Sequence, residues 1–316
     1  MTNKLTTILK AEGLEHLIPT LVDQGIVDSM LADLTESDLK TIGIDKLGER
    51  KRLLTVFGES KSAKPAISVP SNPMVKVEGG VLPSESELEG TNVESFLIGK
   101  YAVTNQEWKT VQDWALVNGF EFSAGSKEWE ELAPSGGSEG TTNPVEAVNW
   151  YDAVKWCNAK SLMEKLKPVY SVKGQEGVYC KGEFGSKGSG NIVESATSNG
   201  YRLPMEAEWE WAARGGCKSQ GYTFAGSNDL DSVGWYDDNS GVESQPVGKK
   251  SPNELGLYDM SGNVWEWCWD LSNKSERSMR GGNWGCIEDL CIISDRNSGA
   301  PDEAFSGFGF RIARSL

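Results

Sequence analysis

The sequence predicts an α+β protein in which a small all-α bundle precedes a larger, loop-rich domain. Three observations support this prediction. Apolar residues recur at helical spacing through residues 1–60. Beyond residue 74 the apolar segments are short, and glycine interrupts them often. The chain also contains 36 glycines and 12 tryptophans, a combination in which aromatic rings cover irregular backbone.

The acidic composition excludes several classes of partner. A net charge of −15 argues against nucleic acid, because phosphate binding requires a basic face. It also disfavours an anionic membrane surface, and no apolar run is long enough to insert into a bilayer. The first residues lack the apolar core of a signal peptide, so we expect the chain as written to be cytoplasmic. A chain whose signal peptide had been removed would look the same.

Residues 1–60 predict several short helices. A capping box at Thr35–Asp38 opens one of them, and Gly43 fits its C-terminal stop. Another runs from about Leu47 to Phe57 with basic residues on its open face. The segments LTESDLKTIGI (residues 34–44) and GERKRLL (residues 48–54) resemble a SAM domain. The resemblance implies self-association or docking to a partner domain; a bundle with a solvated basic face is the alternative.

A linker and the large domain follow the bundle. Residues 61–73 are rich in Ser, Lys and Pro and predict an extended linker, so the large domain spans residues 74–316. We expect strands at 96–98 and 101–103, and an exposed glycine-rich insertion at 172–200. The expected helices follow Thr104 and cover residues 149–157 and 206–214.

The large domain carries long family motifs in a fixed order. They are RLPMEAEWEWAARGG (202–216), GLYDMSGNVWEW (256–267), RGGNW (280–284) and GFR (309–311), with PV at 144–145 and NWYDA at 149–153. Together they resemble the formylglycine-generating-enzyme/sulfatase-modifying family. The resemblance implies a C-type-lectin-like fold: a small twisted sheet, two helices and much ordered loop.

Two groups of side chains with oxygen acceptors lie within these motifs, and each has a structural or a functional interpretation. Asn263 and Glu266 offer oxygens that suit calcium, and the family resemblance implies a calcium site of this kind. The alternative is a buried carboxylate that accepts backbone hydrogen bonds. For Glu206 and Glu208 we expect structural pairing with Arg202 and Arg214. No cofactor is required by either interpretation.

The six cysteines raise the question of an oxidase. They show no CxxC pair, so free buried thiols are favoured over zinc or disulfides. In formylglycine-generating enzymes, two cysteines five residues apart after the RGGS motif bind copper(I), and Cys286 and Cys291 have this spacing. However, Asn283 replaces the motif serine, and residues 292–295 after Cys291 contain no arginine. His16 is the only histidine, which leaves no Ser–His or Cys–His pair in the large domain.

The last residues also resemble the variable region of proteins diversified by retroelements. Error-prone copying of adenines in asparagine codons cannot yield Lys, Glu, Gln, Met or Trp. Between Gly285 and Gly309 only Glu288 and Glu303 belong to that excluded set. We therefore predict a variable region at 280–311. Its expected ligand-binding positions are Gly285, Cys286, Ile287, Asp289, Leu290, Ile292, Ile293, Asp295, Ser298, Gly299, Ala300, Phe305 and Ser306.

The function that we predict is ligand binding rather than catalysis. A variable surface need only be exposed on a rigid scaffold, and exposed Ile and Phe suit a protein ligand. The helical bundle would tether several copies and raise avidity. The alternatives are a copper-dependent oxidase at Cys286 and Cys291, and an undiversified structural or binding member of the fold.

Overall fold

The computed structural model divides the chain into two compact units, Met1–Ser68 and Val69–Leu316. The residues that the structure describes are 9–10, 13–24, 34, 36–46, 48–54, 72–123, 142–184 and 189–316. Most of the predicted linker at 61–73 lies outside these residues. Among the described helices, none combines the length and the apolar character needed to span a bilayer.

The first unit is helical, as the sequence predicts. It contains η1 (Glu15–Leu17), α2 (Ile18–Asp23), α3 (Glu36–Thr41) and a further helical segment at 48–54. Gly43 follows α3 with a φ of +93°, the left-handed conformation that ends helices. The core consists of Leu9, Leu14, Leu17, Leu21, Leu39, Ile44 and Leu53. His16 is exposed, and its ring nitrogen lies 3.1 Å from a carboxylate oxygen of Glu49.

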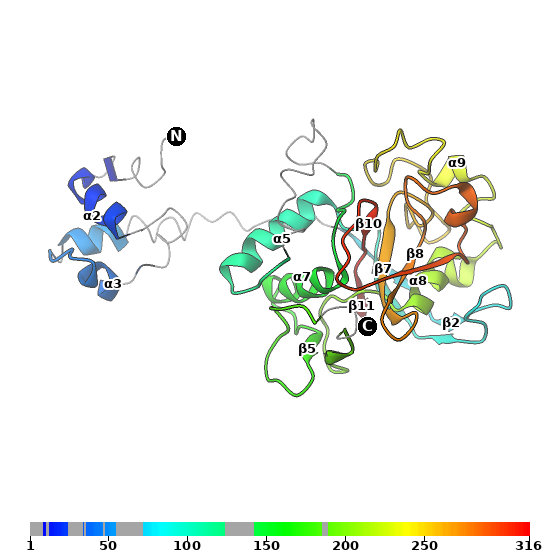
Figure 1. The fold of residues 1–316 in the computed structure, drawn as a ribbon, viewed down its shortest axis with the longest axis horizontal. Helices are drawn as coiled ribbons and strands as arrows, with labels where there is room; N and C mark the ends of the chain where they lie inside the picture. Colours follow the sequence, from blue (N-terminus) through cyan, green and yellow to red (C-terminus); the bar gives the residue numbers. More distant parts are fainter. Residues whose placement is uncertain are drawn as a thin grey trace. The chain divides into compact units, whose positions relative to one another are not determined.

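Two long helices and a shorter one support the second unit (Figure 1). α5 (Asn105–Val117) begins where the Thr104 side chain accepts the backbone N–H of Glu107, as predicted. α7 (Trp150–Met163) begins in the same way at Asn149 and packs against α5. It is longer than predicted and buried on nearly all sides rather than amphipathic. The third helix is α8 (Glu206–Ala213), with a short α9 (Leu230–Val233) after it.

The strand β7 (Trp265–Leu271) lies between two apolar clusters. Trp265 and Trp267 point into the cluster that contains the buried faces of α5 and α7. Cys268 points the other way, into the cluster formed around Trp209 of α8. Because side chains alternate along a strand, this single segment joins both halves of the core. The WEW motif is therefore a core strand with both faces covered.

Four small sheets complete the second unit. The largest has the order β10-β7-β8-β9, in which β8 (Arg277–Arg280) and β9 (Arg296–Gly299) are antiparallel and β10 (Phe308–Gly309) runs parallel to β7. A second sheet has the order β1-β4-β11, which places β4 (Phe96–Gly99) between β1 (Met74–Val77) and β11 (Ala313–Ser315). The remaining elements are β2 (Gly80–Val81) with β3 (Asn92–Val93), β5 (Tyr170–Val172) with β6 (Ile192–Glu194), η3 (Ser189–Asn191), η4 (Gly216–Lys218) and η5 (Glu288–Cys291).

One local prediction differs from the structure. Residues 101–103 do not form a strand, because Val103 makes only two isolated backbone hydrogen bonds: its N–H donates to Phe310, and its carbonyl accepts from Val145. Most described residues of the glycine-rich insertion at 172–200 are exposed, as predicted, and β5 and β6 form an antiparallel pair at its two ends. Tyr170 at the start of this pair is fully buried, so the insertion is anchored in the core.

Candidate functional site

The tail, residues 280–311, starts on a buried ionic cluster. Arg280 is fully buried at the end of β8 and donates to Glu210 at 2.6 Å, to Glu206 at 3.4 Å and to the carbonyl of Ile293 at 3.0 Å. Arg296, further along the tail, binds both carboxylate oxygens of Glu206 at 2.7 and 2.8 Å. Because these arginines surround it, the pKa of Glu206 is lowered although burial opposes this. The cluster fixes two points of the tail onto α8.

The pairing of these carboxylates differs in part from the prediction. Arg202 does bind Glu208, at 2.6 and 2.7 Å. Arg214 binds Glu210 instead, and Glu206 pairs with the tail arginines Arg280 and Arg296. The helical spacing of the EAEWE motif reveals which carboxylates share a face of α8, but it carries no information on partners 70 or more residues away.

A second buried ion pair closes the tail. Arg311 is fully buried and donates to both oxygens of Glu266 at 2.6 and 2.8 Å, and to the carbonyls of Gly99 and Tyr258. The Trp209 indole also donates to Glu266 at 2.6 Å. Charge-assisted, bidentate pairs of this kind are the strong hydrogen bonds of proteins. The two ends of the tail are thus fixed by buried arginines.

This arrangement does not fit the predicted calcium site at Asn263 and Glu266. Both oxygens of Glu266 already accept from Arg311, and a guanidinium beside a carboxylate repels a cation. The Asn263 side chain bonds the backbone of Gln245 in both directions, at 2.9 and 3.0 Å. In the described part of the chain, no group of three or more His, Cys, Asp or Glu residues is placed to hold a metal ion. The residues fit the alternative that the sequence left open, a buried carboxylate that serves the scaffold.

Two loops of the tail lie side by side at Asn283. The first tail loop is residues 285–290 and the second tail loop is residues 302–307. Asn283 accepts the backbone N–H of Gly285 through its side-chain oxygen at 3.0 Å. Its amide lies so close to Gly307 that a Cβ there would fall 2.2 Å from Nδ2, which explains why glycine with a φ of +82° occupies that position. Asn283, expected only as a replacement of the motif serine, therefore joins the loops.

The predicted ligand-binding positions divide by exposure. Ile287 and Phe305 are each 55% exposed and Leu290 is 41% exposed, which is unusual for large apolar side chains. Gly285, Asp289 and Ser306 are also exposed, whereas Ile292, Asp295, Ser298 and Ala300 are half-buried. Three predicted positions are not available at the surface: Cys286, Ile293 and Gly299 are buried. The composition of the tail could not distinguish them, because an apolar residue in an irregular segment has no period to read.

Cys286 and Cys291 are buried free thiols in this structure. Both belong to the apolar cluster that contains Trp265 and Trp267, and burial raises the pKa of each thiol. The Cys291 sulfur lies against the backbone of Gly282, where a Cβ would come within 2.6 Å of it. Copper and oxygen chemistry use the thiolate, which this environment disfavours. The other core cysteines expected from the sequence, Cys157 and Cys268, are fully buried.

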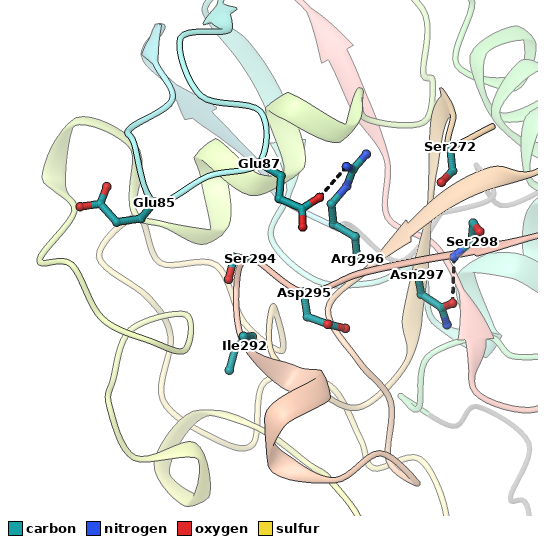
Figure 2. A pocket seen from close by; sticks show the side chains of 9 residues that line it. All are labelled: Glu85, Glu87, Ser272, Ile292, Ser294, Asp295, Arg296, Asn297 and Ser298. Carbon is teal, nitrogen blue, oxygen red and sulfur yellow. Dashed lines mark hydrogen bonds and ion pairs between the residues drawn. The ribbon is translucent and has the colours of Figure 1, made fainter.

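A polar cleft of about 530 Å³ borders the tail on its β9 side (Figure 2). One wall is the loop that carries Glu85 and Glu87, and the other is the tail segment from Ile292 to Ser298. Arg296 crosses the cleft to bind Glu87 at 2.9 Å. Sequence reasoning missed Glu85 and Glu87, because they lie 200 residues before the tail in a segment without a recognisable motif. The cleft shows that residues of the tail face a ligand-sized space as well as open solvent.

Both parts of the chain match known protein families. Residues 59–316 match the sulfatase-modifying factor enzyme 1-like domain, and residues 4–61 match the SAM domain (sterile alpha motif). The chain belongs to the sulfatase-modifying factor family. Its large domain has the C-type-lectin-like fold, and a SAM domain precedes it.

Relatives within the sulfatase-modifying factor family have diverse names. The chaperone protein LppX of Paenibacillus barcinonensis is 35% identical over 83% of this chain and 96% of its own length. A formylglycine-generating enzyme of Bos taurus is 26% identical over 77% of this chain and 70% of its own length. An inactive C-alpha-formylglycine-generating enzyme 2 of Mus musculus is 28% identical over 73% and 79%. Membership of the family therefore leaves open whether this chain is an enzyme.

Two solved structures share this fold at 30% sequence identity. Treponema denticola variable protein 1 superimposes with a TM-score of 0.63, covering 77% of this chain and 95% of that protein. CarF superimposes with a TM-score of 0.65, covering 78% of this chain and 99% of that protein. Both cover nearly their whole length, so the scaffold of the sulfatase-modifying factor domain is common to all three chains.

Proposed function

We propose that this chain is a receptor-like, ligand-binding protein whose tail is diversified by a retroelement and binds a protein ligand. One observation carries the proposal: buried residues fix the tail, while large apolar side chains on its two loops are exposed. Arg280 and Arg311 make buried ion pairs, and Arg296 makes a partly buried one. Ile287, Leu290 and Phe305 project from the two tail loops. This partition is what a surface that varies between copies requires.

The exposed residues suit contact with a protein. Three large apolar side chains are exposed on the two tail loops, and exposed apolar surface is a common feature of interaction sites. The loops are rigidly held, because Asn283 joins them and the ion pairs fix both ends. Loops on a rigid scaffold are the usual location of recognition residues. The 30% identity to a variable protein over 77% of the chain supports the same proposal.

The SAM domain adds a second function to the proposal. Relatives of SAM domains associate with one another or dock to partners, and we assign this function to the first unit. Joining several copies converts weak binding by each tail into avid binding to a multivalent target. A change in the tail would then alter what is bound without altering assembly, because the two activities reside in separate units.

The comparison of DNA with protein tests this proposal most directly. We would sequence the DNA downstream of the gene and align it with the codons for residues 280–311. The expected result is a near-copy that differs only where the copy carries adenines, with the differences falling on exposed positions such as Ile287, Asp289 and Phe305. Absence of such a repeat would overturn diversification.

A formylglycine-generating oxidase remains the second candidate, because relatives include such enzymes and Cys286 and Cys291 have the spacing of the copper ligands. Titration with copper(I) under anaerobic conditions separates the candidates. The oxidase requires stoichiometric binding that Cys286→Ala abolishes, together with oxidation of a cysteine-containing peptide. Ligand binding through the tail loops requires neither.

A further inference from the structure

The β9 strand has a free edge. It pairs with β8 on one side and is the last strand of the sheet order β10-β7-β8-β9. Within the described residues, no segment pairs with its other side. On that side, side chains accept the backbone N–H groups: Ser298 donates to Asn297 at 2.8 Å and Ala300 donates to Glu303 at 3.1 Å, so an added strand would displace these bonds. An unpaired edge of this kind is a template for another extended chain.

The polar cleft lies along this same edge (Figure 2). Asn297 and Ser298 of β9 form part of its lining, so the space that an added strand would occupy is open. A volume of about 530 Å³ is within the range of sites for small ligands and short peptide segments. It is too small for a folded domain. The cleft therefore suits one extended segment of a larger ligand.

The charges of the side chains that line the cleft indicate which kind of peptide segment would bind there. Glu85, Glu87 and Asp295 contribute three carboxylates, whereas Arg296 is the single cation among the lining residues. Arg296 pairs with Glu206 and Glu87, so the cleft keeps an excess of carboxylates over cations. Burial raises the pKa of Asp295 although Arg280 and the backbone N–H of Arg296 oppose this, and Glu87 adds a smaller increase by repulsion. An incoming cation would relieve this repulsion.

We propose that this cleft binds an extended, cationic peptide segment of the ligand, which adds to β9 as a further antiparallel or parallel strand. Main-chain hydrogen bonds to β9 supply affinity, and Lys or Arg at alternate positions faces Glu85, Glu87 and Asp295. The proposal rests on the proposed function and names a class of ligand for it. It also gives the tail two kinds of contact: an apolar one at the tail loops and an ionic one at β9.

A charge-reversal experiment tests the selectivity. The full chain is titrated with a fluorescein-labelled octapeptide of alternating Lys and Val, and with a matched octapeptide of alternating Glu and Val, by fluorescence anisotropy. Glu85→Lys should weaken binding of the Lys peptide at least fivefold. Glu89→Lys is the matched control, because Glu89 is exposed on the same loop but does not line the cleft. It corrects for general attraction to a chain of net charge −15 and should change binding less than twofold.

Backbone methylation of the peptide tests strand addition without altering the protein. Alternate N–H groups of a strand point to opposite sides. Two Lys–Val octapeptides are therefore compared, one N-methylated at its odd residues and the other at its even residues. One should lose binding at least tenfold and the other should bind as the unmodified peptide does. Equal binding of both methylated peptides, or equal effects of Glu85→Lys and Glu89→Lys, would overturn the proposal.

The outcome is separable from that of the proposed function. The DNA repeat is found or missed without reference to any peptide. A repeat together with peptides that fail these criteria would reject strand addition at β9 and leave the diversified tail loops standing. Peptide binding without a repeat would establish the cleft as a site on an undiversified protein.

Discussion

The buried framework that holds the tail and the tail loops differ in where they place charged and apolar side chains. In the framework, Arg280 and Arg311 are fully buried, and their head groups contact Glu206, Glu210 and Glu266. In the loops, Ile287, Leu290 and Phe305 are large and apolar, and yet they are exposed. Charge is inside and apolar surface is outside, the reverse of the usual distribution.

This difference separates the residues that stabilise the fold from the residues that are available for recognition. Buried ion pairs tolerate no unpaired partner, so each arginine requires its carboxylate. Exposed side chains such as Ile287 and Leu290 lie outside the core and can be exchanged at little cost in stability. Four mutational experiments test this contrast, in order of decreasing expected effect on stability.

Arg311→Ala should give the largest loss. It leaves the buried Glu266 without its cation, and removing one partner of a buried pair costs about 3–5 kcal/mol of the free energy of unfolding. Urea denaturation measures this directly. Arg314→Ala is the control, because Arg314 is only partly buried and donates to one carbonyl; it should cost about 1 kcal/mol or less. Equal losses for the two variants would contradict a special role for the framework.

Gly282→Ala should follow. Gly282 has a φ of +76°, and its Cβ would fall 2.6 Å from the Cys291 sulfur and 2.7 Å from the Leu290 carbonyl. Strain and overpacking together should destabilise the fold by roughly 1–3 kcal/mol. At Gly285 the nearest atom to a new Cβ is 3.7 Å away, so Gly285→Ala should change the melting temperature by no more than a few degrees.

The pH dependence of stability should reveal Asp259, a buried carboxylate for which the described residues show no ion pair. Burial raises the pKa of Asp259 from 3.8 to about 6. Because the folded pKa is above the unfolded one, the folded state holds the proton more tightly between these values, and stability falls as pH rises through this window. Lowering the pH from 7 to 5 should therefore stabilise the wild type by about 1 kcal/mol relative to Asp259→Asn. Asp238→Asn, at an exposed position, serves as the reference, and an unchanged slope in Asp259→Asn would argue against this role.

The smallest effect on stability should come from the triple variant Ile287→Ser, Leu290→Ser, Phe305→Ser. Surface substitutions usually stay within about 0.5 kcal/mol each, so its melting temperature should remain within a few degrees of the wild type. Ile293→Ser is the matched control, since Ile293 is buried in the same tail and its replacement should cost about 2–4 kcal/mol. Collapse of the triple variant would mean that the tail loops belong to the scaffold.

The sequence predicted the scaffold well because its motifs are long and its helix signals are local. Thr104 and the glycine at position 43 act through bonds within a few residues, and such signals can be read directly. The partners of Arg280 and Arg296 could not be predicted, because an ion pair between residues 70 or more positions apart leaves no recognisable pattern in the sequence. The exposure of the tail was predicted only in part. Ile287 is exposed and Ile293 is buried, although both are isoleucines in irregular backbone, and only the path of the chain between η5 and β9 decides which one faces the core.

The closing of the second sheet has a consequence for quality control during synthesis. β11 pairs with β4 at Ala313 and Ile98, and the Arg311 that precedes it reaches Gly99 as well. β11 follows the tail in the chain, so the ribosome makes it only after every residue of the tail has been translated. A chain truncated anywhere within the tail would lack both the strand and the arginine. Such a chain would have an open sheet edge and an unpaired buried Glu266, which favour unfolding and proteolysis.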